Sequence, residues 1–214
     1  ATKPRSAGFF SGSGTAVLLR KSLQENSGLE GKVVFFKAED FDGLDSGKGY
    51  LFGGRTSTIY EAGENGVTEV FTSGDDFEAL TAQYLPDYYN CSKDNAVLDD
   101  RSGKKGPEAE SVTVGTVDGR TYAFVALERT GGVMVYDVTE PASAQYVNYI
   151  NTRDFSSTVE SSEEYEDGEL DKWVTGGDVA PEGLLFLGDS VSPTGAALLL
   201  AACEVSGTVA VYQV

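Results

Sequence analysis

The sequence predicts an all-β protein built from repeated antiparallel units, and three observations lead to this prediction. Glycine provides 26 of the 214 residues, which is about 12 % against a typical value of ~7 %. Tyrosines recur at positions 60, 136 and 212, at equal intervals of 76 residues. The segments around these tyrosines alternate apolar and polar residues, which is the pattern of a strand with one buried face.

The repeat is clearest between residues 126–138 and 202–214, which align without gaps and share seven identities. A looser third copy covers residues 57–62. The strands before these segments also repeat, at 122–126 and 197–201 and at 110–115 and 182–188, and residues 145–150 supply a fourth strand in the middle copy. Three or four strands joined by glycine turns are typical of a β-propeller blade of ~40–45 residues. Each period therefore predicts one blade followed by a long connection.

We expect residues 1–30 to form an N-terminal arm or a partial blade, and residues 31–214 to form a propeller-like domain. The blade copies end near positions 62, 138 and 214, and an acidic loop spans 155–178. One short helix is predicted at 75–85, where apolar residues recur at helical spacing and Pro86 follows. About three blades cannot close a ring, which needs ~4–8. The sequence predicts a partial propeller, or one completed by other chains through its open strand edges.

Composition excludes several classes of function. The chain has 34 acidic and 16 basic residues, no histidine and a formal net charge of -18. Without histidine there is no Ser-His-Asp or Cys-His nucleophile pair. The acidic balance argues against nucleic-acid binding, which depends on Lys and Arg, and no window approaches the ~18 apolar residues of a membrane span. Carboxylate, hydroxyl and Arg/Lys chemistry remain, together with hard cations bound by oxygen.

Four motifs, at residues 52–60, 105–112, 126–138 and 180–184, together resemble the choice-of-anchor I family of extracellular propeller proteins. Members of this family are also described as similar to mesenchyme-specific cell surface glycoproteins. The resemblance covers about residues 33–214 and matches only the C-terminal part of the longer family pattern. It implies an extracellular or cell-surface location. Some members carry an alkaline-phosphatase label, which implies a phosphoric ester hydrolase as the alternative.

One group of charged residues carries the main candidate chemistry. Its members fall at or near repeat-equivalent positions: Glu108, Glu110, Glu128 and Arg129, then Glu182 and Glu204, with Arg55 in the first copy. Equivalent positions of successive blades converge on the propeller axis, so a carboxylate ring that binds Ca²⁺ is one hypothesis. A Ca²⁺ ion beside an arginine could support phosphoester hydrolysis. The alternative is that these residues form ion pairs and turn hydrogen bonds between blades.

A second candidate Ca²⁺ site comprises Asp40, Asp42 and Asp45. The full EF-hand pattern requires a glutamate at position 12 of the loop, and the residue at that position is Leu51. Asp42-Gly43 is also a common hairpin turn signal. A plain turn is therefore the alternative interpretation.

Three further features bear on location and local structure. Asn90 begins an N-x-S glycosylation sequon, which has meaning in a secreted protein. Cys91 and Cys203 could form one disulfide, remain as two buried thiols or link to other chains, and the sequence does not decide between these. The glycine pairs at 53–54 and 131–132 are expected to be turn glycines with positive φ rather than a phosphate loop.

These observations predict a secreted or cell-surface protein that works by interaction. We expect a homo-oligomer or larger assembly formed through open blade edges, with other extracellular proteins or glycans as further partners and possible Ca²⁺ binding. The alternative function is a Ca²⁺-dependent phosphoesterase of propeller type. A third interpretation is a processed half of a longer propeller that needs its other half.

Overall fold

The computed structural model of the chain describes residues 35–36, 42–43, 45, 50–51, 55–64, 66–156 and 176–214. The described part is mostly β with one short α-helix, as expected. The strands are β1 (Phe35–Phe36), β2 (Tyr50–Leu51), β3 (Thr58–Gly63), β4 (Gly66–Thr72), β5 (Ala109–Val117), β6 (Arg120–Leu127), β7 (Val133–Asp137), β8 (Gln145–Ile150), β9 (Pro181–Leu187), β10 (Leu198–Cys203) and β11 (Val209–Gln213). The helix is α2 (Asp76–Tyr84), and the 3-10 turns are η3 (Pro86–Tyr88) and η4 (Pro141–Ser143). The predicted arm at 1–30 and most of the acidic loop lie outside the described residues.

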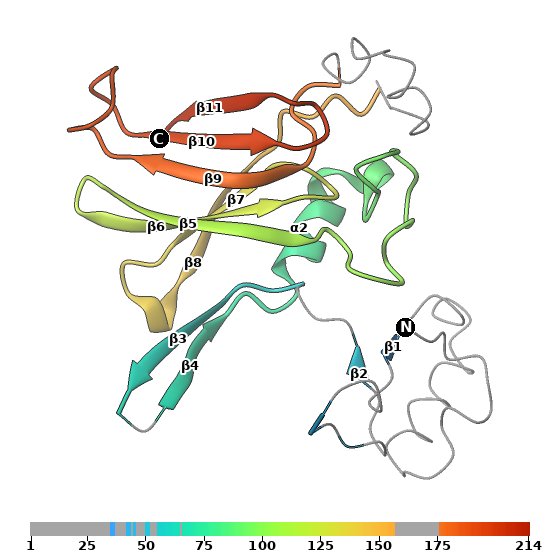
Figure 1. Cartoon of the computed structure of the whole chain (residues 1–214), viewed down its shortest axis with the longest axis horizontal. Coiled ribbons are helices and arrows are strands. Elements are labelled where there is room, and N and C mark those ends of the chain that lie inside the picture. Colours follow the sequence, from blue (N-terminus) through green and yellow to red (C-terminus); the bar gives the residue numbers. More distant parts are fainter. Residues whose placement is uncertain are drawn as a thin grey trace.

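The strands form antiparallel sheets in chain order (Figure 1). The largest is the four-stranded sheet β5-β6-β7-β8, and a three-stranded sheet β9-β10-β11 follows it. Two smaller pairs, β1-β2 and β3-β4, precede them. Within the described ranges these sheets do not close into a ring of blades.

Strand pairing shows that the repeat of 76 residues is also a repeat of backbone geometry. Tyr122 lies opposite Asp137 in the middle copy, and Leu198 lies opposite Gln213 in the last copy. Residues 122–126 therefore correspond to 198–202, one position later than the alignment expected from sequence. The copy around Tyr60 follows the same plan. The β3-β4 pair shifts register beside Tyr60, as the β7-β8 pair does beside Tyr136.

One face of the four-stranded sheet packs against helix α2. Because successive side chains of a strand point to opposite faces, Val125 and Leu127 face the helix while Phe124 faces away. The buried cluster on the helix side contains Phe77, Val125, Leu127, Met134 and Tyr136. The Tyr136 hydroxyl donates to Asp76 at the start of α2, over 3.0 Å. The predicted helix at 75–85 is confirmed, and it covers this sheet.

The opposite face of the four-stranded sheet packs against β9-β10-β11. Phe124, Val133 and Val135 form a buried cluster with Leu199 of the second sheet. The Phe124 and Phe186 rings stack with centroids 5.8 Å apart. Gly115 lies beneath Phe186, so closely that a Cβ at this position would overlap the ring. The absence of a side chain at Gly115 therefore allows the two sheets to approach.

The repeated tyrosines lie at equivalent places in the three copies but differ in burial. Tyr136 is buried, and Tyr212 packs at the cluster between the sheets. Tyr60 in β3 is 56 % exposed. Gly131 and Gly132 have φ values of 91° and 83°, which confirms them as turn glycines.

Of the helices in the described ranges, none has both the length and the apolar character that a membrane crossing requires.

Candidate functional site

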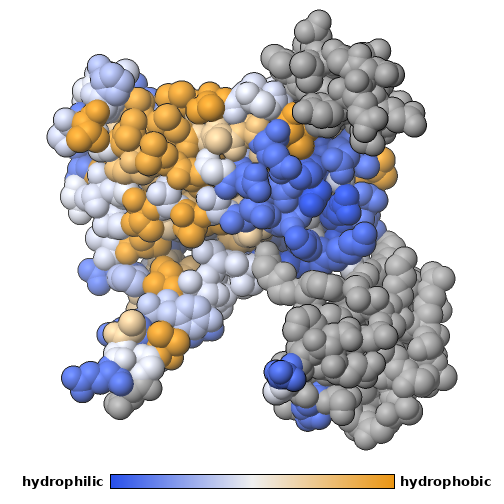
Figure 2. All heavy atoms as spheres, viewed as in Figure 1, coloured by the Kyte–Doolittle hydropathy of each residue, from blue (hydrophilic) through white to orange (hydrophobic). Residues whose placement is uncertain are grey.

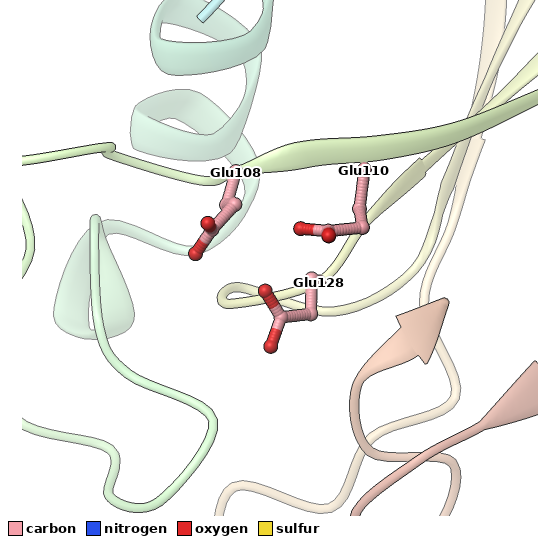
Figure 3. A group of neighbouring side chains, drawn as sticks. All are labelled: Glu108, Glu110 and Glu128. Atoms are coloured by element: carbon pink, nitrogen blue, oxygen red, sulfur yellow. The ribbon is translucent and has the colours of Figure 1, made fainter. Parts of the chain in front are cut away.

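The candidate site lies where β5 begins and β6 ends. It contains Glu108, Glu110 and Glu128, whose carboxylate oxygens lie within 4.8 Å of one another (Figure 3). Glu108 and Glu128 are buried, whereas Glu110 is exposed. Three oxygen ligands at this separation could bind a metal ion, because hard cations prefer carboxylate oxygen.

Local backbone geometry brings these side chains together. Glu108 adopts a left-handed conformation with φ 58°, which is uncommon for a residue other than glycine. Its carbonyl oxygen accepts a hydrogen bond from the Glu128 backbone N–H over 2.8 Å, which holds the two chain segments side by side. A bulge between Ala109 and Ser111 displaces Glu110 from the regular ladder. A bulge re-aims the side chain at its position, and here that residue is a glutamate.

The last copy, β9-β10-β11, has the same backbone geometry at the equivalent positions, with different side chains. Ala180 has φ 63° at the position equivalent to Glu108, and its carbonyl accepts from the Glu204 N–H over 2.8 Å. Glu182 lies at the equivalent bulge, between Pro181 and Gly183. Glu182 and Glu204 line a shallow pocket with Cys203 and Val209. The structure thus separates the expected ring into the triad and this second pair of carboxylates.

Cationic side chains of the protein already neutralise the triad. The Arg129 Nε and the Lys105 Nζ both contact the Glu108 carboxylate. The Lys93 Nζ lies 2.7 Å from Glu128 Oε1. Glu108, Glu128 and Arg129 thus form ion pairs at this end of the four-stranded sheet.

Lys93 also joins the two repeats. Its Nζ lies 2.9 Å from Glu204 Oε2, so one ammonium group binds Glu128 and Glu204, which occupy equivalent positions in successive sheets. The Lys93 side chain is only 17 % exposed. No sequence pattern identifies Lys93, because its role depends on the path of the long loop between η3 and β5.

The environments of the two buried glutamates shift their pKa values in opposite directions. Burial alone would raise the pKa of Glu108, but hydrogen bonds from Lys105 and Arg129 outweigh it and lower that pKa. Burial raises the pKa of Glu128, and the hydrogen bond from Lys93 only partly opposes the effect. Glu108 therefore holds its charge more firmly than Glu128 as the pH falls.

This difference predicts a change in acid stability for Glu108→Gln. A carboxylate with a lowered pKa in the folded state contributes stability above the ordinary glutamate pKa, and the contribution is lost as the pH falls through the folded-state pKa. The substitution should lower the free energy of unfolding by about 2 kcal/mol at neutral pH, as for a lost hydrogen bond to a charged group. It should also make the loss of stability on acidification less steep. Urea unfolding over a series of pH values measures both effects.

Glu110→Gln is the matched control, because Glu110 belongs to the same triad but is exposed. It should change stability by less than ~0.5 kcal/mol. An acid slope of Glu108→Gln equal to that of the unmodified chain would contradict the prediction.

Two of the other expected sites lie elsewhere. Arg55 does not join the triad; its guanidinium contacts Glu78 Oε1 at 2.6 Å and the carbonyl of Ser102 at 2.5 Å. Asp42 and Gly43 form an exposed turn, and Gly43 has φ 84°. This supports the turn interpretation of that segment. Asp45 is exposed, and Asp40 lies outside the described residues.

The structure argues against a glycan on Asn90. The residue is buried, and Nδ2, the atom to which a glycan would be attached, donates to Glu78 Oε1 over 2.8 Å and to Ser102 Oγ over 2.9 Å. A sequon shows only that the tripeptide is present, and here the fold encloses its asparagine.

The two cysteines are free and buried, so they do not form the disulfide that was one of the alternatives. Burial raises the thiol pKa of Cys91, and it raises that of Cys203 to about 11. Both residues therefore remain protonated thiols near neutral pH, and thiols in this form are poor nucleophiles.

Sequence reasoning also missed Arg153, which fixes the loop that carries Lys93. Its side chain is buried, and Nη1 donates to the carbonyls of Ser92 over 3.0 Å and Arg129 over 2.9 Å. The guanidinium also lies 4.8 Å from the centroid of the Phe155 ring. An arginine next to an acidic segment carries no pattern that marks it as buried.

Comparison with known proteins identifies one family and two distant relatives. A family model described as the choice-of-anchor I domain matches residues 13–141, which is more than half of the chain. Gigasin-3a of Magallana gigas is 28 % identical over 170 residues, covering 77 % of this chain and 57 % of that protein. The mesenchyme-specific cell surface glycoprotein of Strongylocentrotus purpuratus is 30 % identical over 100 residues, covering 42 % of this chain and 13 % of that protein. No solved structure gives a significant match.

Proposed function

The chain belongs to the choice-of-anchor I domain family, and from this membership we propose that it is an extracellular or cell-surface protein that works by interaction. The observation that carries the proposal is its distant similarity to a protein named as a cell surface glycoprotein. The chain spans 57 % of the length of Gigasin-3a and 13 % of the length of the mesenchyme-specific cell surface glycoprotein. The proposal therefore concerns this chain alone.

The geometry of the site favours interaction over catalysis. The carboxylates of Glu108 and Glu128 are paired with Lys93, Lys105 and Arg129, which makes them a scaffold between segments. A general acid or base must instead exchange a proton with a substrate within hydrogen-bond reach. The sheets β5-β8 and β9-β11 fit successive propeller blades in strand order and in face-to-face packing. The proposed partners are further copies of the chain and other extracellular proteins or glycans.

Antibody labelling of intact cells that make the protein tests the proposed location. The label should reach the protein without permeabilisation, and part of the protein should be recovered from the medium or the surrounding matrix. Labelling that requires permeabilised cells would overturn the proposal.

The second candidate function is a Ca²⁺-dependent phosphoesterase. It is favoured by one observation, namely that the triad lies next to Arg129, because a cation and an arginine can together bind a phosphate group. The donor set fits a hard cation in chemistry, but that cation would compete with Lys93 and Arg129 for the same oxygens. Turnover of a chromogenic phosphate ester that requires Ca²⁺, stops with chelator and is lost in Glu110→Gln would support this function. Absence of turnover, with no shift in melting temperature on adding Ca²⁺, would exclude it.

A further inference from the structure

The sheet β9-β10-β11 presents an apolar face to solvent. Its exposed side chains include Leu185 at 54 %, Val209 at 59 % and Val211 at 58 %. Leu200 connects them, because it pairs with Leu185 on one side and with Val211 on the other. Figure 2 shows hydrophobic side chains gathered over the part of the molecule that these strands occupy. Contiguous apolar surface of this kind marks an interaction site.

The repeat shows what kind of surface covers such a face. Val209 and Val211 lie at the positions of Val133 and Val135, and Leu200 lies at the position of Phe124. In the four-stranded sheet these three positions are buried beneath the next sheet, with Leu199 at the centre of the contact. The exposed face is therefore the same face one repeat later, and among the described residues no sheet covers it.

The other end of the described chain carries the complementary element. Tyr136 and Tyr212 both point to the side of their sheets that faces the preceding layer, and both pack there. Tyr60 is their equivalent in β3, as the shared register shift beside each tyrosine shows. Tyr60 is nevertheless 56 % exposed. The chain thus displays one face of a contact that it already makes between its own sheets, together with Tyr60, the equivalent of one tyrosine on the other face.

We infer that a second copy of the chain docks head to tail, with the β9-β11 face of one copy packed against the Tyr60 side of β3-β4 in the next. The inference rests on the proposed role in interaction, and it continues an interface already present within the chain. Because the two contacting surfaces differ, the contact is heterologous and leaves one free surface at each end. Such a contact produces a closed ring or an open filament rather than a symmetric dimer.

Two charge substitutions test the inference by light scattering. Val211→Glu and Tyr60→Glu each place a charge on one of the two surfaces, at positions exposed in the single chain. The unmodified chain should show a mass that is a multiple of 22.7 kDa and rises with micromolar concentration. Each variant alone should have the mass of one chain, because every contact needs both surfaces and all copies of a variant lack the same one. An equal mixture should give a dimer that contains one copy of each, because each variant keeps the surface that the other has lost.

Val191→Glu is the matched control, since Val191 is 70 % exposed in the turn between β9 and β10. It should associate as the unmodified chain does, and all three variants should keep the unmodified melting temperature within a few degrees. A monomeric unmodified chain, normal association of Tyr60→Glu or a mixture that stays monomeric would each overturn the inference. Surface labelling of cells separates this result from the function: loss of head-to-tail association leaves the labelling of Val211→Glu unchanged, whereas failure of the proposed function abolishes labelling of the unmodified protein.

Discussion

Replacing Arg153 with methionine is expected to lower the free energy of unfolding by about 4 kcal/mol, in the range for breaking a buried, hydrogen-bonded charge. Arg153 is 7 % exposed, and its guanidinium donates to the carbonyls of Ser92 and Arg129. Methionine fills part of the volume but donates no hydrogen bond, so these buried carbonyls would be left without a partner. Each such group costs about 1–3 kcal/mol.

Thermal unfolding followed by circular dichroism measures this effect, at roughly 2–4 °C for each kcal/mol in a domain of this size. Arg120→Met is the matched control, because the Arg120 side chain is 64 % exposed and forms an ion pair with Asp137. It should change stability by less than ~1 kcal/mol. Equal losses in the two variants would show that Arg153 acts as a surface charge and not as a buried anchor.

Replacing Gly132 with alanine is expected to cost about 3 kcal/mol, through two separate terms. Gly132 has φ 83°, where an L-residue with a Cβ is strained by about 1–2 kcal/mol. In addition, a Cβ at this position would lie 2.5 Å from the Ile150 carbonyl oxygen, which is a backbone atom fixed by the β7-β8 pairing. The β7-β8 pair must therefore shift to admit the methyl group.

Gly119→Ala separates the two terms. Gly119 has φ 78°, but a Cβ there would meet nothing within 4 Å. This variant should lose only the conformational term, about 1–2 kcal/mol. Urea unfolding of both variants gives the difference, and equal losses would mean that the Ile150 carbonyl moves without cost.

The repeat and the single helix could be predicted from the sequence because their signals are local. Alternation of apolar residues, turn glycines and the spacing of Tyr60, Tyr136 and Tyr212 need no tertiary knowledge. The alignment of the strands before the tyrosines was wrong by one residue, because two continuous apolar runs match almost equally well at either offset. Only the cross-strand partners of Tyr122 and Leu198 decide between them.

The site was predicted in part, because only some of its residues lie next to strands with a local sequence pattern. Glu108, Glu110 and Glu128 flank predicted strands, so their proximity followed from the hairpin that joins β5 to β6. Lys93 and Arg153 were not identified, because their partners depend on the path of a long loop without periodic pattern. The same loop encloses Asn90, and the sequon pattern does not show this burial. Arg55 joins Glu78 instead of the triad, because the residues before β3 do not continue the repeat closely enough to fix its position.

The position of Lys93 has a consequence for how the protein unfolds. In a stacked repeat protein each unit contacts only its neighbours, so units can open one at a time from an end. Lys93 comes from the loop before the first of the two sheets, yet its ammonium binds Glu128 of that sheet and Glu204 of the next. Opening β9-β10-β11 alone would therefore break the contact between Lys93 and Glu204, while Lys93 stays bound to Glu128. These three parts are expected to melt in a single cooperative transition, with Lys93 as the side chain that couples them.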